Sequence, residues 1–343
     1  MIIEAELEFI WFFAFVILLT GYVILDGFDL GVGMLHLFSK KDEERRILLN
    51  TIGPVWDGNE VWLVTAGGAL FAGFPPVYAT VCSAFYIPIM LLLTGIIFRA
   101  VAIEVRSKQP MAWWRWVWDI MFSFASFVIA FGLGFAVGNM IRGIPLDENG
   151  DFIGDFASMV DFYSLLCGVM AVALFLMHGA IYTLMKTEGQ LHDKIRRNVN
   201  PAIILFIICY AAVTMTTLVY MPHMTEAFKE RPIFFLVGLL DILVIANIPR
   251  EISLGRDGWA FISSCVNIIL LMMLYGIGTY PEVIRAINDP ANLSLTIYNS
   301  ASSTKTLEIL LLIAVIGIPM VVSYTFAVYW IFHGKVKLDS HSY

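Results

Sequence analysis

The stretch FIWFFAFVILLTGYVILDGFDLGVGMLHL, residues 9–37, decides the fold class of this chain. It is long and apolar enough to cross a bilayer as a helix, because about 20 apolar residues span the hydrocarbon layer. It also contains two acidic residues, Asp26 and Asp29. A charge at the centre of a membrane costs about 2.5–3.5 kcal/mol on insertion scales, so it persists only beside a partner, a proton or water. The stretch predicts a membrane helix whose carboxylates handle ions or protons.

The composition of the whole chain extends this conclusion. Of its 343 residues, 59% are hydrophobic and only 14% are charged, whereas soluble domains carry about one quarter charged residues. The net charge is −7 and no basic stripe is present, so a nucleic-acid partner is not expected. The four cysteines stand alone in apolar stretches, which is typical of small buried side chains rather than metal ligands or disulfides.

Nine stretches have the length and composition of membrane helices. They lie near residues 9–37, 53–73, 77–103, 116–141, 162–185, 201–221, 233–249, 257–279 and 307–333. The stretch 53–73 is the least apolar, because its first half contains Asp57, Asn59 and Glu60. We therefore expect an all-α, polytopic membrane protein: a single integral membrane domain over residues 1–343, with two four-helix bundles plus one peripheral helix.

The distribution of Lys and Arg predicts an N-terminus outside and a cytoplasmic C-terminus, because cytoplasmic loops carry the excess of these residues. With nine spans, the inner side receives 16 of the 21 Lys and Arg residues. The outer side receives only Arg142, Lys229, Arg231, Arg285 and Lys305. Omitting the second stretch would break this alternation at every later loop, so the charge pattern favours nine spans as well as the orientation.

Four carboxylates are expected to meet inside the membrane. Asp26 and Asp29 are three residues apart and share one helix face, as do Asp57 and Glu60 on the next helix. The two helices are antiparallel neighbours in the chain, which favours contact between them. The Gly27–Gly31 spacing also lets another helix backbone approach closely.

Such a cluster fits a proton route that opens to the cytoplasm. Four close carboxylates cannot all be ionised at low cost, so some should hold a proton near neutral pH. A proton route needs groups that take up and release a proton and that are connected by water. The alternative is structural: the same residues could pair with one another or cap helix ends, and so hold the helices together.

Other polar residues in the apolar stretches are open to two interpretations. Arg99 and Asp119, near the inner ends of their helices, could compensate or extend the cluster, or simply reach the interface. Asp241, in the middle of its stretch, could contact a partner or pair inside the bundle. His178 could serve as an axial haem ligand only in a roomy pocket, and the sequence favours a hydrogen-bonded histidine instead.

Two long motifs resemble a known family. Residues 21–33, GYVILDGFDLGVG, are followed by GPVWDGNEVWL at 53–63 and GGALF at 67–71. Shorter matching segments are FRAV from Phe98, RSK from Arg106, Trp118-Asp119, Gly138-Asn139, HGAIY from His178, KTEG from Lys186 and SLTIY from Ser294. Essentially from end to end, the chain resembles subunit II of cytochrome bd-type quinol oxidases.

The resemblance implies a membrane enzyme complex in which this chain ligates no haem. The partner, subunit I, would carry haem b and haem d, or b-type haems throughout, together with the quinol site. A small single-helix subunit can accompany the two. The complex would sit in the lipid bilayer of a bacterial or archaeal plasma membrane. It would oxidise quinol and reduce O2 to water with four electrons and with four protons taken from the cytoplasm.

The family motifs cover most of the candidate residues. Asp26, Asp29, Trp56, Asp57, Trp62, Arg99, Asp119 and His178 all fall in matching segments. By resemblance, the carboxylates are candidates for a proton route, and the two tryptophans would lie near the subunit contact or an apolar O2 path. Glu60 departs from members with Gln at that position, and Asp241 lies outside the motifs.

Two other functions remain open from the residues alone. Buried carboxylates would serve a proton-coupled membrane transporter equally well. The chain could also be a purely structural scaffold that stabilises the haem subunit without carrying protons.

Overall fold

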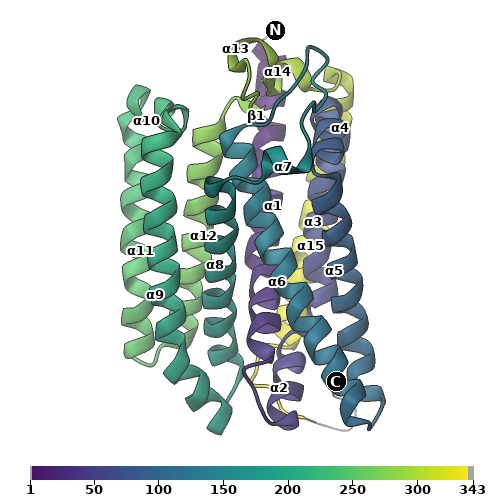
Figure 1. The fold of residues 1–343 in the computed structure, drawn as a ribbon, viewed down its shortest axis with the longest axis vertical. Helices are drawn as coiled ribbons and strands as arrows, with labels where there is room; N and C mark the ends of the chain where they lie inside the picture. Colours follow the sequence, from purple (N-terminus) through teal and green to yellow (C-terminus); the bar gives the residue numbers. More distant parts are fainter. Residues whose placement is uncertain (1, 339–343) are drawn as a thin grey trace.

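The computed structural model describes residues 2–338, with side chains from Glu6 onward, and these residues are almost entirely helical (Figure 1). The longer helices are α1 (Ile2–His36), α2 (Asp42–Ile52), α3 (Trp56–Gly73), α4 (Pro75–Ala84), α5 (Tyr86–Val105), α6 (Ala112–Arg142), α8 (Phe162–Lys186), α9 (Gly189–Tyr220), α11 (Phe235–Ser253), α12 (Asp257–Thr279) and α15 (Thr304–Ile331). The short elements are η1 (Arg106–Lys108), α7 (Phe156–Met159), η2 (Pro222–Thr225), α10 (Glu226–Glu230), η3 (Pro232–Phe234), β1 (Glu282–Ile284), α13 (Pro290–Leu293), β2 (Leu295–Thr296) and α14 (Ile297–Ser300).

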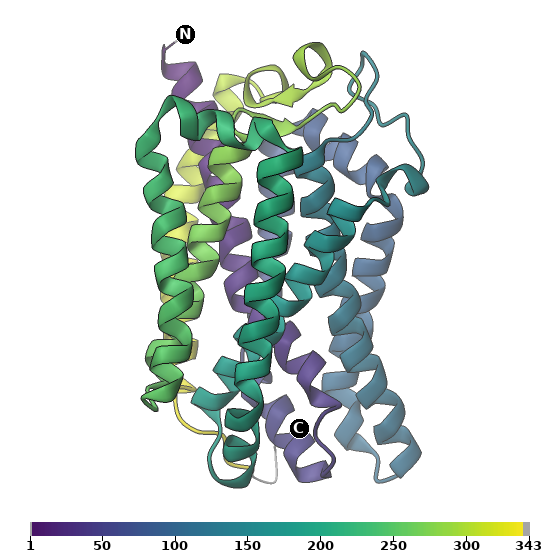
Figure 2. The ribbon, with the colours of Figure 1, turned by 60° about the vertical axis from the view of Figure 1, so that its left-hand side comes forward.

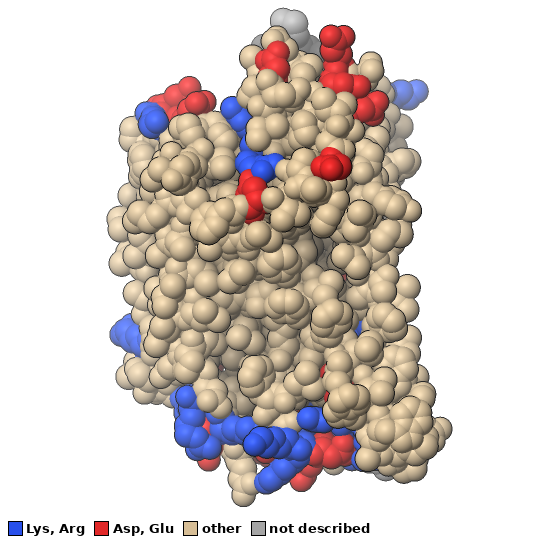
Figure 3. Space-filling model, viewed as in Figure 1, with Lys and Arg blue, Asp and Glu red and all other residues tan. Residues whose placement is uncertain are grey.

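Eight helical segments of the described residues are long and apolar enough to cross a membrane. They are Glu6–His36, Tyr86–Lys108, Ala112–Arg142, Phe162–Lys186, Gly189–Tyr220, Pro232–Ser253, Asp257–Thr279 and Thr304–Ile331. On the face seen in Figure 3, charged side chains gather at the two ends of the molecule and leave a broad, mostly uncharged belt between them. The chain is therefore an all-helical, multi-pass membrane protein.

The predicted second span corresponds to α3, which is not among these eight segments. It has 18 residues, and its first two turns contain Asp57, Asn59 and Glu60, which lower its mean hydropathy. The helix nevertheless packs along α1 and contacts α15. The count of nine spans and the orientation in the membrane stay predictions.

Two expected boundaries differ from the structure. The predicted third span, 77–103, is interrupted at Phe85, where α4 ends and α5 begins. Pro88 explains the interruption, because it has no N–H to donate to the carbonyl of Ala84 four residues earlier. The connection before α3, expected as a loop, contains the amphipathic helix α2, which lies at the lower end of the molecule in Figure 1.

The end of the molecule opposite α2 is closed by the loops at residues 142–161 and 280–303. The strands β1 and β2 pair antiparallel there, and Ile144 bridges to Ala286. Asp147 accepts hydrogen bonds from the backbone amides of Asp151 and Asn149, each 2.9 Å long, and these bonds lower the pKa of its carboxyl group. Figure 2 shows this loop layer over the helix ends.

The helices pack around α8, the most enclosed of them. In the most apolar 18-residue stretch of α8, 61% of the residues are buried, whereas no residue is buried in the corresponding stretch of α15. One group consists of α1, α3, α5 and α6, in which α1 packs against α3 and α6, and α6 packs against α5. The other group consists of α8, α9, α11 and α12, in which α8 packs against α9 and α12, and α12 packs against α11. Because α1 and α6 also pack directly on α8, the two groups of four helices are joined into one body, and α15 lies outside them against α1 and α3.

Close contact between the backbones of α1 and α8 joins the two groups. A Cβ atom added at Gly179 of α8 would lie 2.6 Å from the Gly31 backbone of α1, and one at Gly27 would lie 3.0 Å from the Phe175 ring. Residues with side chains at these positions would force the helices apart. The close approach predicted from the Gly27–Gly31 spacing is confirmed.

We expect Gly179→Ala to destabilise the protein by about 1–3 kcal/mol, because the added methyl group meets backbone atoms that cannot move aside. The measurement is the midpoint of thermal unfolding of the protein in detergent. Gly132→Ala on α6 is the matched control, since a Cβ there has no neighbour within 4 Å. Equal midpoints for the two variants would show that the α1–α8 contact is looser than described.

Candidate functional site

The buried carboxylates gather around one arginine. Arg99 on α5 forms a bidentate ion pair with Asp26 on α1: Nη1 donates to Oδ2 at 2.9 Å, and Nη2 donates to Oδ1. Nη2 also lies 3.7 Å from Oδ2 of Asp29, and Nη1 lies 3.6 Å from Oε1 of Glu60 on α3. These four residues are named the Arg99 cluster. Arg99 and the two aspartates are buried, and the Glu60 side chain is 14% exposed.

Two polar residues that the sequence analysis did not select complete the cluster. Asn59 of α3 donates from Nδ2 to Oδ2 of Asp29 at 2.8 Å and to the carbonyl of Leu25 at 3.1 Å. Its Oδ1 accepts a hydrogen bond from the Tyr329 hydroxyl of α15 at 2.9 Å. Asn59 could have been selected from the sequence because it lies between Asp57 and Glu60 in an apolar stretch. Nothing in the sequence linked Tyr329 to the cluster.

The Arg99 cluster contains more acidic groups than its one cation balances. Asp26 occupies both terminal nitrogens of Arg99, while Oδ1 of Asp29 and Oε1 of Glu60 have no hydrogen-bond partner among the described residues. Three ionised carboxylates beside one guanidinium, away from water, would repel one another strongly. Asp29 and Glu60 are therefore the groups of the cluster best suited to hold and release a proton.

Asp57 does not join the cluster, although the sequence placed all four carboxylates together. It lies on the exposed face of α3 and makes no hydrogen bond or ion pair with any residue from 6 to 338. The reason is its angular position: Asn59 faces α1, and the exposed residues of α3 follow a separate helical stripe of Asp57, Val61, Val64, Gly68 and Phe71.

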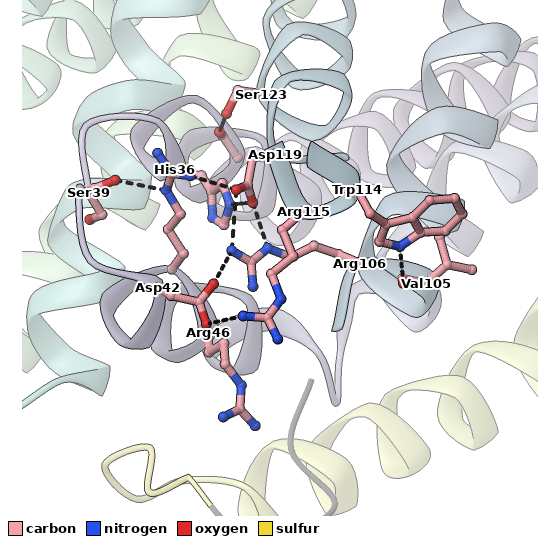
Figure 4. A network of polar contacts seen from close by, with 12 residues as sticks. His36, Ser39, Asp42, Arg46, Val105, Arg106, Trp114, Arg115, Asp119 and Ser123 are labelled. Carbon is pink, nitrogen blue, oxygen red and sulfur yellow. Dashed lines mark hydrogen bonds and ion pairs between the residues drawn. The ribbon is translucent and has the colours of Figure 1, made fainter. Parts of the chain in front are cut away.

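Asp119 also lies elsewhere, in a second buried network at the α2 end of the molecule (Figure 4). Its Oδ1 lies 2.5 Å from Nε2 of His36 and accepts from Nε of Arg106 at 2.6 Å. Its Oδ2 accepts from Arg45 at 2.6 Å, and Arg106 also donates to Asp42 at 2.8 Å. These five residues are named the Asp119 network. Asp119 thus does not extend the Arg99 cluster; it ties α1, α2, η1 and α6 together.

The two tryptophans differ in their surroundings. Trp56 is 9% exposed and packs in an apolar cluster with Leu49 and Ile103. The ring of Trp62 lies directly against Gly21 of α1, where any side chain would collide with it. Both therefore help to fix α3 on α1 beside the Arg99 cluster.

Comparison with known proteins now bears directly on this arrangement. The family described as cytochrome bd terminal oxidase subunit II matches residues 7–332. The chain belongs to this family. It is 32% identical over 364 residues to the cytochrome bd-I ubiquinol oxidase subunit 2 of Escherichia coli K12, covering 97% of this chain and 96% of that protein.

Further relatives agree with the family assignment. The cytochrome bd ubiquinol oxidase subunit 2 of Bacillus subtilis is 31% identical over 342 residues, covering 97% of this chain and 98% of the relative. Among solved structures, a chain of the bd oxidase from Geobacillus thermodenitrificans superposes with a TM-score of 0.79 at 17% identity, covering 95% of this chain and 98% of that one. The resemblance found in the sequence motifs is confirmed, and these relatives are bacterial.

The family implies haem in the complex, and His178 is the residue that the sequence raised as a possible axial ligand. His178 of α8 is fully buried; its Nε2 lies 3.0 Å from the carbonyl of Ile24 and its Nδ1 lies 2.7 Å from the Ser264 hydroxyl. A carbonyl accepts only, so Nε2 carries the proton and Nδ1 accepts from Ser264. Neither nitrogen is free for iron. His178 does not fit the role of an axial ligand and instead links α8 to α1 and α12.

We expect Asp119→Asn to destabilise this bd subunit by about 3–5 kcal/mol, because it removes the buried negative charge that receives His36, Arg45 and Arg106. Arg106 then keeps only the partly exposed Asp42 as an ion-pair partner among the described residues. The midpoint of thermal unfolding in detergent measures the effect. Asp193→Asn, the same substitution at an exposed position of α9, should stay within about 0.5 kcal/mol of the unsubstituted protein. If Asp119→Asn unfolds no earlier than Asp193→Asn, the Asp119 network contributes nothing to stability.

Proposed function

We propose that this chain is the non-haem subunit of a bd-type quinol:O2 oxidoreductase and that its Arg99 cluster supplies protons to the complex. The haems and the quinol site belong to subunit I, and both subunits lie in the bacterial inner membrane with the Lys- and Arg-rich end in the cytoplasm. The observation that carries the proposal is a buried set of three carboxylates with one arginine, in which Asp29 and Glu60 keep unpaired oxygen atoms.

The exposed stripe of α3 favours a contact with subunit I on this side of the molecule. Val64 is 73% exposed and Phe71 is 59% exposed, and the acidic Asp57 lies on the same stripe. A carboxylate on a lipid-facing surface is costly, so it indicates a protein or water neighbour in the complex. Asp57 would then stand at the boundary between the two subunits.

This geometry gives the acidic residues separate roles. Asp57, the exposed group, collects a proton; Glu60, partly exposed and 3.6 Å from Arg99, passes it inward; and Asp29 holds it in the interior. Asp26, through its bidentate pair, keeps Arg99 in place. The fixed Arg99 charge limits the repulsion between successive carboxylates as the proton moves between them.

Asp29→Asn tests the proton role. The amide can still accept the hydrogen bond from Asn59 but cannot carry a proton, so quinol-driven O2 uptake by the purified complex should fall at least about tenfold with unchanged haem content. Asp57→Asn should also slow uptake, whereas Glu60→Gln should have a smaller effect, because other members carry Gln there.

Asp193→Asn serves as the control in the same assay, because that carboxylate is exposed on α9 and outside the Arg99 cluster. Full activity of Asp29→Asn with its haems in place would refute the proton route. Loss of the haems would instead favour the scaffold role, in which the chain only stabilises its partner.

Asp26→Asn separates the structural carboxylate from the proton-carrying ones. It leaves Arg99 buried without its bidentate partner, so we expect a loss of about 3–5 kcal/mol in stability. Yield of intact complex and thermal unfolding measure this, beside Asp29→Asn as the variant expected to assemble normally. An Asp26→Asn complex as stable as the unsubstituted one would mean that Asp29 and Glu60 are sufficient to compensate Arg99.

A further inference from the structure

A fully buried carboxylate lies in the other helix group, away from the Arg99 cluster. Asp241 sits on α11, whose main contacts are with α12, η3 and α9. Neither of its carboxylate oxygens has a hydrogen-bond partner among the described residues, and no Lys or Arg of the described chain forms an ion pair with it. The outward positions Leu239, Leu240 and Leu243 are each more than half exposed, so Asp241 points inward from a lipid-facing helix.

The groups around Asp241 do not compensate a negative charge. From α9, the Tyr210 hydroxyl lies near the Asp241 carboxylate, but it carries no positive charge. From α12, Asn267 is fully buried at nearly the same level, and its amide atoms also lack partners among the described residues. An ionised carboxylate without donors in an apolar interior costs several kcal/mol, whereas the protonated acid is neutral.

A file of hydroxyl groups leads from Asp241 toward the loop layer. Tyr210, Thr214 and Thr217 repeat at the i, i+4 and i+7 positions of α9 and share one face. The Thr217 hydroxyl donates to the carbonyl of Val213 and lies 2.8 Å from the Tyr163 hydroxyl of α8, so Tyr163 donates to Thr217. These four residues are named the hydroxyl file.

The outer end of the hydroxyl file is polar. Tyr163 follows Asp161, the N-cap residue of α8, which accepts a hydrogen bond from the Ser164 amide and is paired with Arg142. The Asp161 side chain is 27% exposed. The last residue of the file thus lies two residues from a partly exposed carboxylate at the edge of the acidic loop at residues 142–161.

The opposite direction along α11 is closed. The inward stripe continues from Asp241 with Ile245, Ile248 and Ile252, all buried. The next polar pair, in which Asn247 donates to Ser263 at 3.0 Å, lies six residues from Asp241 on a different face, about 9 Å along the helix. Along α11 itself, Asp241 thus has aliphatic neighbours in this direction, whereas the hydroxyl file lies in the other.

We infer that Asp241 is a proton-binding site, separate from the Arg99 cluster, that exchanges its proton with the loop-layer end of the molecule along the hydroxyl file. Each Thr and Tyr hydroxyl can accept and donate one hydrogen bond, as transfer from group to group requires. The site gives the second helix group a buried store for one proton, with access from the end opposite to α2.

Infrared spectroscopy of the purified protein with its partner subunit tests the protonation state. The C=O stretch of a protonated carboxylic acid is distinct from the carboxylate bands. The difference spectrum between the unsubstituted protein and Asp241→Asn at neutral pH should show the loss of one such C=O band. Loss of a carboxylate band instead would mean that Asp241 is ionised and would overturn the inference.

The rate at which that C=O band shifts after transfer to D2O tests the access route. Thr217→Val removes one hydroxyl of the file and should slow the D2O-induced shift of the C=O band about tenfold. A factor of about that size corresponds to the net free energy of one hydrogen bond. Thr216→Val is the matched control, because it is adjacent on α9 but bonds only to its own helix at Ala212. Equal rates for Thr217→Val and Thr216→Val would rule out the hydroxyl file as the route.

Discussion

The bidentate pair between Asp26 and Arg99 is the interaction on which the proposed function depends. It joins α1 to α5 in the membrane interior, where water cannot supply hydrogen bonds and each charge must find its partner within the protein. This pair uses both terminal nitrogens of Arg99, to which no other arginine of the described residues adds its charge. Asp29 and Glu60 therefore lie 3.6–3.7 Å from the same guanidinium without a hydrogen bond to it. The arrangement of three carboxylates around one guanidinium therefore produces both the fixed Asp26–Arg99 pair and the two carboxylates without a hydrogen bond to Arg99.

The two buried networks of this subunit have opposite charge balance. The Arg99 cluster holds three carboxylates to one arginine, whereas in the Asp119 network one carboxylate receives His36, Arg45 and Arg106 at distances of 2.5–2.6 Å. A carboxylate bound by several donors stays ionised and stabilises the helix ends that it joins. A carboxylate with a shared cation can change its protonation state. Charge balance, more than residue type, separates the structural acid from those proposed to carry protons.

Much of the fold and part of the site followed from residue patterns. Apolar length located the membrane helices, the Gly27–Gly31 spacing indicated close contact with another helix, and the acids in the family motifs selected α1 as a candidate site. Residue patterns were less informative about direction. Asp57 was expected with the other carboxylates but lies on the exposed face of α3, and whether Asp119 extends the cluster was left open, because spacing along a helix gives relative angles but not which face meets a neighbour. The helix α2 and the interruption at Pro88 were not predicted, because α2 lacks the apolar length of a membrane helix.

The sequence by itself determined that the chain is a multi-pass helical protein of the bd subunit II family. The length of an apolar segment and the presence of acidic residues within it are local properties, and they do not depend on how the helices pack. Only the tertiary structure decided which acids share Arg99, that Tyr329 reaches Asn59 from the far end of the chain, and that no Lys or Arg within residues 6–338 pairs with Asp241. Those facts depend on the rotation and register of helices far apart in the sequence. Contacts of this kind are fixed by packing of whole surfaces rather than by any one segment.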